Sequence, residues 1–511
     1  MNRIHINQLG YRPNDLKIAV IPPDDSKFSI VRVSDETVVF SGTAGEPFSD
    51  AASTDTVRRA DFSAFTTAGE FTVCAGKTRS FPFLITDDPY SQLRDALLEM
   101  FNYQKCGIDL KCGLWSHPAC HTSLATVYGS TEKKDVSGGW HDAGDYGRYI
   151  VPAAKSVADL LLAYELSLTK KDNKLLDIVW FEIEWMFKMQ DKTTGGVYHK
   201  VSCAQFNSLY EMPHDEHEEL FLSPISGTAT ADFAAKMALA SRFYPEQKDK
   251  LLNAAKYAWD WCCANPEAGG FTNPPDIRTG GYGDENSDDE RFWAACELFA
   301  ATKEEKYHNY IKASNLYTGL GWGDMGAYGL IAYLMHTNGS SDDVLTQRIK
   351  NEILRECQEI MDKYQNDAYG VSLGEVYKWG STMMIANNAM MLLFGSRLFP
   401  GGSEYTQAAL EHFHYLLGRN PISQSYITGF GSNFPKNPHH RPSAAKGSAV
   451  PGMVVGGPCM HVITRDIALT THCEGFPPAK RYIDHWESFS SNEITIYWNS
   501  PVYFVMAVLG L

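Results

Sequence analysis

Two carboxylates stand three residues apart in the Gly-rich segment 137–146, which reads Ser-Gly-Gly-Trp-His-Asp-Ala-Gly-Asp-Tyr. Gly144 lies between Asp142 and Asp145, and because it lacks a Cβ the backbone can turn sharply there. Clustered acids beside aromatic rings suit acid–base chemistry on a neutral, ring-shaped substrate. A calcium loop or a helix cap would also explain these residues, since the amphipathic stretch 154–164 follows directly.

A third carboxylate, Glu493, lies at a predicted loop-to-helix junction in segment 491–500, close to Trp498. A carboxyl group near apolar rings loses hydration, which raises its pKa and favours the protonated form that a general acid needs. A glutamate that is merely stabilised by the dipole at a helix N-terminus is the alternative.

A third feature is the loop that runs from Ser425-Tyr-Ile-Thr-Gly-Phe-Gly to Pro438-His-His-Arg-Pro442. It brings several polar donors together between prolines, and such a loop can bind several hydroxyl groups in fixed positions. An ordinary surface loop would have a similar composition.

Two groups of residues could bind metals. Cys106, Cys120, His121 and His141 form a Cys2His2 set by type, which is the ligand set of many structural zinc sites. Their spacing is not finger-like, but His141 directly precedes Asp142; buried free cysteines are the alternative.

The second group is the acidic run 283–290, Gly-Asp-Glu-Asn-Ser-Asp-Asp-Glu, which enters a predicted helix. Dense oxygen donors suit Ca²⁺, although the EF-hand spacing is missing. A solvated, helix-capping acidic run is the alternative.

The elements that position these residues change in character at Thr86-Asp-Asp-Pro89. Before this break, short β-branched runs separated by turn residues predict a β-sandwich, with strands at 18–21, 28–33, 37–40, 71–73 and 81–85. After it, helical periodicity predicts helices at 91–103, 154–168, 174–190, 229–241, 251–262, 290–301, 304–316, 343–364, 381–398, 405–417 and 494–509. About a dozen helices around one core suit an α/α barrel, and a helical-repeat array is the alternative. Long loops at 106–150, 196–228, 264–289 and 419–493 carry all the motifs, as functional loops commonly do.

Bulk properties narrow the class of protein. A chain of 511 residues predicts two domains. The net charge of −16 argues against nucleic acid or an anionic membrane as a partner. There is no apolar run long enough to span a membrane, and the start has no apolar signal-peptide core. The cysteine count of 11 is odd, so the cysteines cannot all pair within the chain. We therefore expect a cytoplasmic protein, or a secreted one if a leader has been removed; the oligomeric state stays open.

Together the motifs resemble glycoside hydrolase family 9, the inverting β-glucanases. The Asp-Ala-Gly-Asp-Tyr loop, the His-x-Arg block after Gly-Phe-Gly, and the Asn-Glu block with Asp484 upstream occur in the family's order. The resemblance extends to the segments 195–200 and 415–421, and to Asn-Gln-Leu-Gly-Tyr at 7–11, which resembles the start of an immunoglobulin-like module. It implies an all-β immunoglobulin-like sandwich at 1–86 followed by an all-α (α/α)6 barrel at 87–511.

The resemblance also implies catalytic roles. Asp145 corresponds to the general base that deprotonates the attacking water, and Asp142 to a helper that holds this water. Glu493 corresponds to the general acid that protonates the leaving oxygen. In inverting enzymes the two catalytic carboxyls stand roughly 6.5–9.5 Å apart, which leaves room for the water.

Substrate-binding roles follow in the same way. His439 and Arg441 match positions that grip sugar hydroxyls near the scissile bond. Trp379, in a segment that resembles a sugar platform, is a stacking candidate, and so is Trp498, which stands where many members carry Tyr. Tyr146, directly after Asp145, is a further candidate. Each of these aromatic side chains could equally belong to the core.

For the metals, the resemblance implies a structural zinc on Cys106, Cys120, His121 and His141, with Cys112 and His117 as competing ligands. Four protein ligands leave no open position, so this Zn²⁺ would brace the catalytic loop and would not activate water. A structural Ca²⁺ would use Asp289, Glu290 and Asp324.

The expected activity is hydrolysis of β-1,4-linked glucans, with endo-β-1,4-glucanase action first. The alternative within the fold is an exo-acting enzyme that removes glucose or glucosamine from oligosaccharide ends, with the acidic insert 214–219 blocking one end of the cleft. A non-enzymatic carbohydrate-binding protein is the third reading, and the intact Asp142, Asp145 and Glu493 argue against it.

Overall fold

The computed structural model describes residues 3–168, 171–337, 339–460 and 465–511. The chain forms two compact units, Met1–Met100 with Cys357–Leu511, and Phe101–Glu356. The boundaries fall inside α1 (Ser91–Tyr103) and α9 (Asp343–Gln365). Across the described part of the chain, no helix combines the length and apolarity needed to cross a bilayer.

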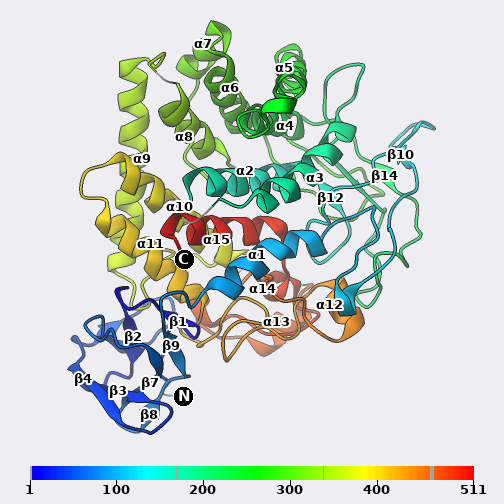
Figure 1. Ribbon diagram of the computed structural model, residues 1–511. Coiled ribbons are helices and arrows are strands. Elements are labelled where there is room, and N and C mark those ends of the chain that lie inside the picture. The colour runs from blue at the N-terminus through cyan, green and yellow to red at the C-terminus, as the bar shows by residue number, and fades with distance from the viewer. Residues whose placement is uncertain (1–2, 169–170, 338, 461–464) are drawn as a thin grey trace. The chain divides into compact units, whose positions relative to one another are not determined.

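The first unit begins with a β-sandwich made of two sheets (Figure 1). One sheet has the order β1-β9-β7-β3-β4, with β8 paired to β7, and the other has the order β2-β6-β5. Among the described strands of the sandwich, β1 and β9 pair in parallel and the other neighbours run antiparallel. The strands are β1 (Gly10–Tyr11), β2 (Ile18–Ile21), β3 (Lys27–Arg32), β4 (Val38–Thr43), β5 (Phe48–Ser49), β6 (Thr56–Asp61), β7 (Gly69–Ala75), β8 (Thr78–Arg79) and β9 (Phe83–Ile85).

Alternation along these strands builds the core of the sandwich. Phe28 and Ile30 of β3 and Phe71 and Val73 of β7 point inward, and each of these side chains is at most 2% exposed. Successive side chains of a strand face opposite sides of the sheet, so Ser29, between Phe28 and Ile30, is partly exposed, whereas Thr72, between Phe71 and Val73, is also buried. The strand β6 escaped sequence prediction because its Thr-Val-Arg-Arg-Ala-Asp sequence is mostly polar.

Most helices of the first unit come from its C-terminal segment, and the unit also includes α1 up to Met100. α10 (Ser381–Leu398), α11 (Ser403–Leu416) and α15 (Ile496–Leu509) pack against one another (Figure 1). Every residue of α15 is buried, which makes it a core helix. Short helices occupy the long loop before it: α12 (Arg441–Lys446), α13 (Ile467–His472) and α14 (Phe489–Asn492).

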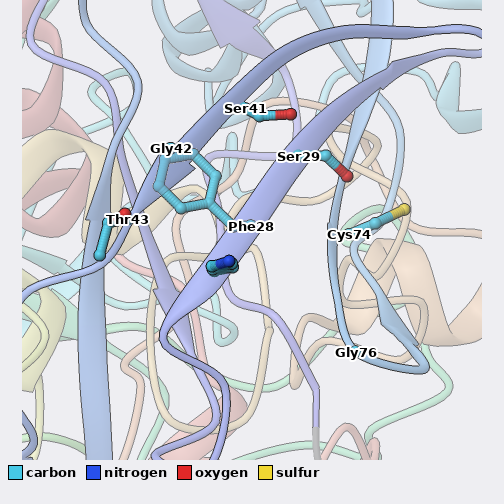
Figure 2. Close-up of a pocket in the computed structure, with 8 residues that line it drawn as sticks. Phe28, Ser29, Ser41, Gly42, Thr43, Cys74 and Gly76 are labelled. Carbon is cyan, nitrogen blue, oxygen red and sulfur yellow. The ribbon is translucent and has the colours of Figure 1, made fainter.

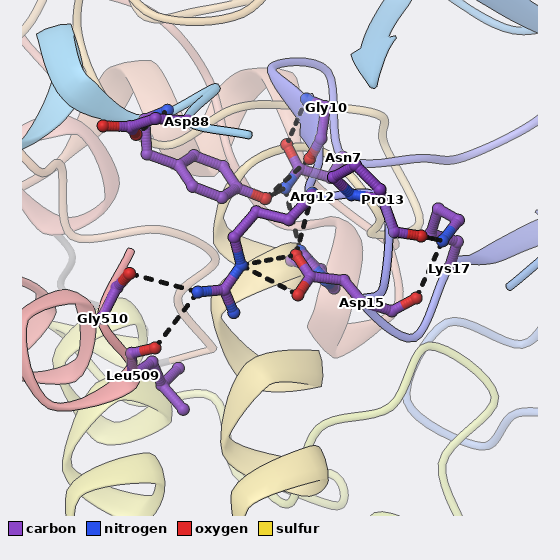
Figure 3. Close-up of polar contacts among 11 residues, drawn as sticks. Asn7, Gly10, Arg12, Pro13, Asp15, Lys17, Asp88, Leu509 and Gly510 are labelled. Atoms are coloured by element: carbon purple, nitrogen blue, oxygen red, sulfur yellow. Dashed lines mark hydrogen bonds and ion pairs between the residues drawn. The ribbon is translucent and has the colours of Figure 1, made fainter. Parts of the chain in front are cut away.

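The β-sandwich is tied to these helices by polar contacts (Figure 3). The guanidinium of Arg12, held by Asp15 at 2.9 Å, donates to the carbonyls of Leu509 and Gly510 at 3.3 and 3.1 Å. A cation at the last carbonyls of a helix satisfies acceptors that have no intrahelical partner. The sandwich thereby caps the C-terminus of α15.

The second unit is helical, with a small sheet at its edge. α4 (Gly227–Ala240) is buried along its whole length and contacts α2, α5 and α6, and α6 contacts α8 (Figure 1). The other helices are α2 (Ile150–Leu166), α3 (Asn173–Met189), α5 (Lys248–Ala264), α6 (Asp288–Thr302), α7 (Glu305–Ala313) and α8 (Gly326–His336). The sheet has the order β11-β10-β14-β13-β12, from β10 (Ala125–Val127), β11 (Lys133–Lys134), β12 (Arg148–Tyr149), β13 (Lys200–Ser202) and β14 (Phe221–Leu222). Three-residue helical turns complete the elements: η1 (Gly113–Trp115), η2 (Pro245–Gln247) and η3 (Pro478–Lys480).

The predicted helices at 91–103 and 381–398 match α1 and α10, and the others differ from the observed bounds by a few residues. The sequence did not predict α8, whose Gly-Ala-Tyr-Gly-Leu-Ile-Ala-Tyr run contains two glycines, nor the five short strands inside the predicted loops 106–150 and 196–228. These strands exist because segments distant in sequence pair there. The predicted domain boundary at residue 86 lies between β9 and α1.

Candidate active site

The loop that carries Asp142 and Asp145 lies in the second unit and is held by hydrogen bonds to its backbone groups. The backbone N–H of Trp140 donates to Glu182 Oε2 at 2.6 Å, and Gln104 Nε2 donates to the carbonyls of His141 and Ala143 at 3.0 and 2.9 Å. The N–H of Asp142 closes the turn on the carbonyl of Gly147 at 2.9 Å. All residues from Trp140 to Ile150 are buried, so both acids lie in a buried, hydrogen-bonded turn.

Each acid of this loop accepts a hydrogen bond from a phenol that the sequence analysis did not single out. The hydroxyl of Tyr282 donates to Asp142 Oδ2, and that of Tyr149 donates to Asp145 Oδ2 at 3.4 Å. Asp145 Oδ2 also accepts the N–H of Gly147 at 3.1 Å. Asp142 is 1% exposed, and Asp142 Oδ1 has no hydrogen-bond partner among the described residues. Burial raises the pKa of Asp142 well above its usual range, against the effect of the Tyr282 hydroxyl.

The segment that carries Tyr282 is anchored by two residues of segment 195–200, Gly-Gly-Val-Tyr-His-Lys. His199 Nε2 donates to the carbonyl of Gly281 at 2.8 Å, and the ammonium of Lys200 bonds Thr279 Oγ1 at 3.0 Å. Burial lowers the pKa of Lys200 to about 7. Tyr282 itself has a positive φ of 47°, a conformation that is uncommon outside glycine and often marks functional sites. A lone Tyr in a Gly-rich loop offered no sequence signal for this role.

Glu493 belongs to the first unit and lies between α14 and α15. It is half-buried, and its carbonyl accepts the N–H of Gly456 at 2.9 Å. His439 pairs with it as a short parallel bridge, with the His439 N–H on the carbonyl of Asn492 at 2.8 Å. Thr495 caps α15 by accepting the N–H of Trp498, which fixes where the helix begins after Glu493.

The loop around Glu493 is organised by Asp484. Its carboxylate accepts the backbone N–H groups of Lys436 and Asn437, each at 2.8 Å, and the amide of Asn492 at 3.1 Å. This carboxylate therefore joins the segment that leads to His439 to the residue that precedes Glu493. His439 Nδ1 donates to the carbonyl of Trp486 at 2.6 Å, and burial followed by the charge of Arg441 lowers the pKa of His439 to about 4.

The predicted aromatic contacts differ in exposure. Trp379 is 42% exposed and packs beside Phe489, with ring centroids 5.6 Å apart, and Phe489 in turn contacts the ring of His439. Trp498 is only 2% exposed, and the residues against its ring include Gly380 and Gly456. The structure thus places Trp498 in the core, because it lies on the fully buried helix α15, and Trp379 at the surface.

Tyr146 and Arg441 are also buried, at 5% exposure each. The hydroxyl of Tyr146 donates to the carbonyl of Glu211 at 2.5 Å, and its ring contacts those of His121 and His141. Arg441 is the first residue of α12.

The four predicted zinc ligands come together in the second unit. The ligand atoms of Cys106, Cys120, His121 and His141 lie within 4.8 Å of one another, and all four side chains are buried. The Sγ atoms are 3.8 Å apart, His141 Nε2 is 3.8 Å from Cys120 Sγ and 3.4 Å from His121 Nδ1, and Cys106 Sγ is 3.5 Å from His121 Nδ1. A tetrahedron with Zn–S bonds of about 2.3 Å and Zn–N bonds of about 2.0–2.1 Å has edges of roughly 3.3–3.8 Å, so the donor set fits zinc.

The chemistry of one of the two thiols agrees with this fit, whereas the contact with Cys106, followed by burial, raises the pKa of the Cys120 thiol. Although burial raises the pKa of the Cys106 thiol, contacts with Cys120 and the charges of Arg148 and His141 hold it well below its ordinary value. A thiolate is the form that binds a metal. The competing ligands Cys112 and His117 are outside the four-ligand group.

The predicted calcium residues meet a further acid. Glu290 is fully buried and neither carboxylate oxygen has a hydrogen-bond partner among the described residues; the same holds for Asp232 of α4. Burial, and then the charge of a neighbouring acid, raises the pKa values of both groups well above the usual range; this acid is Asp232 for Glu290 and Asp289 for Asp232. Asp289 accepts the N–H of Met325 at 2.6 Å, and burial raises the pKa of Asp324 to about 6. Asp289, Glu290 and Asp324 do not form a tight three-ligand group in the described part of the chain, but unpartnered buried carboxylates favour a nearby cation.

A cavity of about 460 Å³ lies elsewhere, on the sheet of β3, β4 and β7 (Figure 2). Phe28, Ser29, Gly42 and Cys74 are among its lining residues, and none of the predicted site residues lines it.

The families that match this chain divide it between the β-sandwich and the helices. A profile of glycosyl hydrolase family 9 matches residues 90–506, and one of the cellulase N-terminal ig-like domain matches residues 1–80. A cellodextrinase from Butyrivibrio fibrisolvens is 34% identical over 99% of both chains.

Among solved structures, a single mutant (D468A) of a thermostable endoglucanase from Alicyclobacillus acidocaldarius aligns over 100% of both chains with a TM-score of 0.93 and 36% identity. A zinc-binding triple mutant of GH family 9 endoglucanase J30 aligns over 98% of this chain and 100% of the other, with a TM-score of 0.90 and 29% identity. These matches confirm the predicted fold class, a β-sandwich followed by a helical domain that fits an (α/α)6 barrel.

Proposed function

The chain belongs to glycosyl hydrolase family 9 and is a glycoside hydrolase of β-1,4-glucans, and on this premise we propose how its carboxylates divide the reaction. The observation that carries the proposal is the buried turn in which Asp142 and Asp145 each accept a phenol hydrogen bond. Asp145 is the general base, Asp142 holds the water, and Glu493 is the general acid.

In this scheme Asp145 removes a proton from the water while the water oxygen bonds to the anomeric carbon. The glycosidic C–O bond breaks on the opposite face of the sugar, and Glu493 transfers its proton to the departing oxygen. The product has the inverted, α configuration. Solvent then returns Asp145 to the carboxylate and Glu493 to the acid.

His439 and Arg441 are proposed to bind sugar hydroxyls beside Glu493, and the exposed Trp379 to stack on a sugar ring. Asp484 supports this arrangement because it joins the segment leading to His439 to Asn492. Trp498 is not proposed as a stacking residue, since its ring is buried.

The metals are proposed to be structural. The tetrahedral edges of the Cys106, Cys120, His121 and His141 group support a Zn²⁺ that fixes the turn following His141. The buried oxygens of Glu290 and Asp232, which lack a hydrogen-bond partner in the described part of the chain, support a Ca²⁺ near Asp289, with Asp324 as a further candidate ligand. Neither metal would take part in the bond-breaking or proton-transfer steps.

The proposed mode of action is endo-β-1,4-glucanase. Exo action on cellodextrins is the second candidate, favoured by the similarity to a cellodextrinase along the whole chain. Digestion of cellohexaose distinguishes the two modes: endo action yields mid-length products early, whereas exo action yields glucose or one short product throughout. Anomer detection by NMR in the same reaction must show the α product first; a β product would refute the inverting scheme. Chitosan oligomers test the glucosamine alternative.

We also propose that the enzyme works in a reducing compartment such as the cytoplasm. The described residues include all 11 cysteines, and each is a free thiol in the structure. Fractionation of the source cells, with recovery of the activity outside the cytoplasm, would refute this location.

A further inference from the structure

The acidic segment 211–219 contacts the zinc group through Glu216. Glu216 Oε2 lies 2.8 Å from His121 Nε2, and the two side chains are only 6% and 2% exposed. The other nitrogen of the same ring, Nδ1, faces Cys106 Sγ at 3.5 Å. A ring nitrogen beside a carboxylate carries the hydrogen, which leaves the lone pair on the opposite nitrogen.

We propose that Glu216 is a positioning residue for the zinc group. It accepts the Nε2–H of His121, fixes the tautomer in which Nδ1 can bind the metal, and sets the plane of the ring. The inference rests on the zinc site proposed above. Outer carboxylates of this kind orient metal-binding histidines and increase their basicity. The backbone of His121 has a positive φ of 51°, a conformation that is uncommon outside glycine.

Two further contacts tie the same segment to the residues around the metal. The Tyr146 hydroxyl donates to the carbonyl of Glu211 at 2.5 Å, while its ring contacts the rings of His121 and His141 at 5.6 and 4.9 Å. The ring of His214 stacks on that of His117, with centroids 5.9 Å apart and an interplanar angle of 7°. The metal would therefore hold two segments in place, the catalytic turn through His141 and segment 211–219 through Glu216.

A competing arrangement would make Glu216 itself a ligand. The ligand atoms of Cys203, Glu216 and Glu218 also lie within 4.8 Å of one another. Glu218, however, is exposed, and the Cys203 thiol already donates to the carbonyl of Glu218 at 3.9 Å. The hydrogen bond to His121 thus accounts for the buried orientation of Glu216 better than a second metal does.

The test measures zinc retention in the purified full-length protein. Elemental analysis gives the zinc content, and competition with a chromogenic chelator gives the affinity. Glu216→Met removes the acceptor and should weaken zinc binding by about 10–100-fold, the usual loss for such an outer partner. Glu216→Gln keeps an acceptor oxygen and should recover part of this loss. Glu219→Gln is the matched control, because Glu219 is 53% exposed and its partners among the described residues are Thr126 and Lys133.

Hydrogen exchange supplies a second readout. In the wild type, chelation of zinc should remove protection from 211–216, and in Glu216→Met this protection should be low even with zinc bound. Wild-type protein that holds no zinc would overturn the zinc site and this inference with it. Wild-type protein with zinc and an equally tight Glu216→Met variant would overturn the positioning role alone. Binding of a second equivalent of metal that is abolished in Cys203→Ser would also overturn the positioning role.

Discussion

Removal of the Tyr282 hydroxyl isolates the contribution of one hydrogen bond to the catalytic turn. Tyr282→Phe keeps the ring, which packs edge-on against Tyr149 and Trp322 at 4.9 and 5.3 Å, so the fold should be retained. What is lost is the donor to Asp142 Oδ2, and Asp142 Oδ1 already lacks a partner in the described structure. The variant therefore leaves a buried carboxylate without its phenol donor.

The size of the effect follows from that loss. A hydrogen bond to a charged group contributes about 1.5–3 kcal/mol, and each 1.36 kcal/mol of barrier is tenfold in rate, so kcat should fall by about 10–150-fold. The pKa of Asp142 is already raised by burial and should rise further. Since the ionised form holds the water, the acidic limb of the kcat/KM profile should move to higher pH.

The assay is initial-rate hydrolysis of cellohexaose across pH, with thermal unfolding as a check on folding. Tyr149→Phe is the matched comparison: its bond to Asp145 is long, at 3.4 Å, and Asp145 keeps the N–H of Gly147. We expect a loss of less than about tenfold there, because the bond removed is weak. A Tyr282→Phe enzyme with kcat within twofold of wild type and an unmoved acidic limb would show that Asp142 does not depend on this hydroxyl.

Four further outcomes are expected. Asp145→Asn should abolish hydrolysis with little change in folding stability, because it removes the base and keeps its shape; wild-type turnover would contradict the assignment, since such groups contribute about 10²–10⁴-fold. Glu493→Gln should be nearly inactive on cellooligosaccharides but much less impaired on a dinitrophenyl glycoside, whose leaving group needs no proton; equal losses would point to a structural role. Cys120→Ser should reduce the zinc content, the melting temperature and the activity together, as measured by elemental analysis, calorimetry and initial rates. Full stability of the zinc-free wild type would refute the bracing role. Burial lowers the pKa of His412 from 6.5 to about 4, so between pH 6.5 and pH 4 the unfolded chain binds a proton that the folded chain does not. The free energy of unfolding should therefore fall as the pH falls through that window, by at most about 1.4 kcal/mol per pH unit. A His412→Gln variant whose free energy of unfolding has the same slope against pH would contradict this.

Several features of this protein follow from local sequence alone. Strand alternation and helical periodicity are local properties, so the β-to-helix change after residue 86 and most helices could be predicted. The Asp142–Asp145 turn was predictable for the same reason, since two acids, a glycine and aromatic neighbours lie within ten residues. The zinc group was predicted through a family resemblance carried by short motifs, and the structure brings those four ligands together.

Other features depend on contacts between residues far apart in the chain. Trp498 lies five residues from Glu493, yet its ring is buried because every residue of α15 faces other elements. Tyr282 reaches Asp142 across 140 residues, and Glu216 reaches His121 across 95, through loops with no periodic pattern. Asp232, whose carboxylate has no hydrogen-bond partner among the described residues, lies in an alanine-rich helix that resembles ordinary core. Local sequence sets the backbone preferences of each segment, but which polar group meets which partner is decided by tertiary packing, because burial makes an unpaired donor or acceptor costly only once the chain is folded.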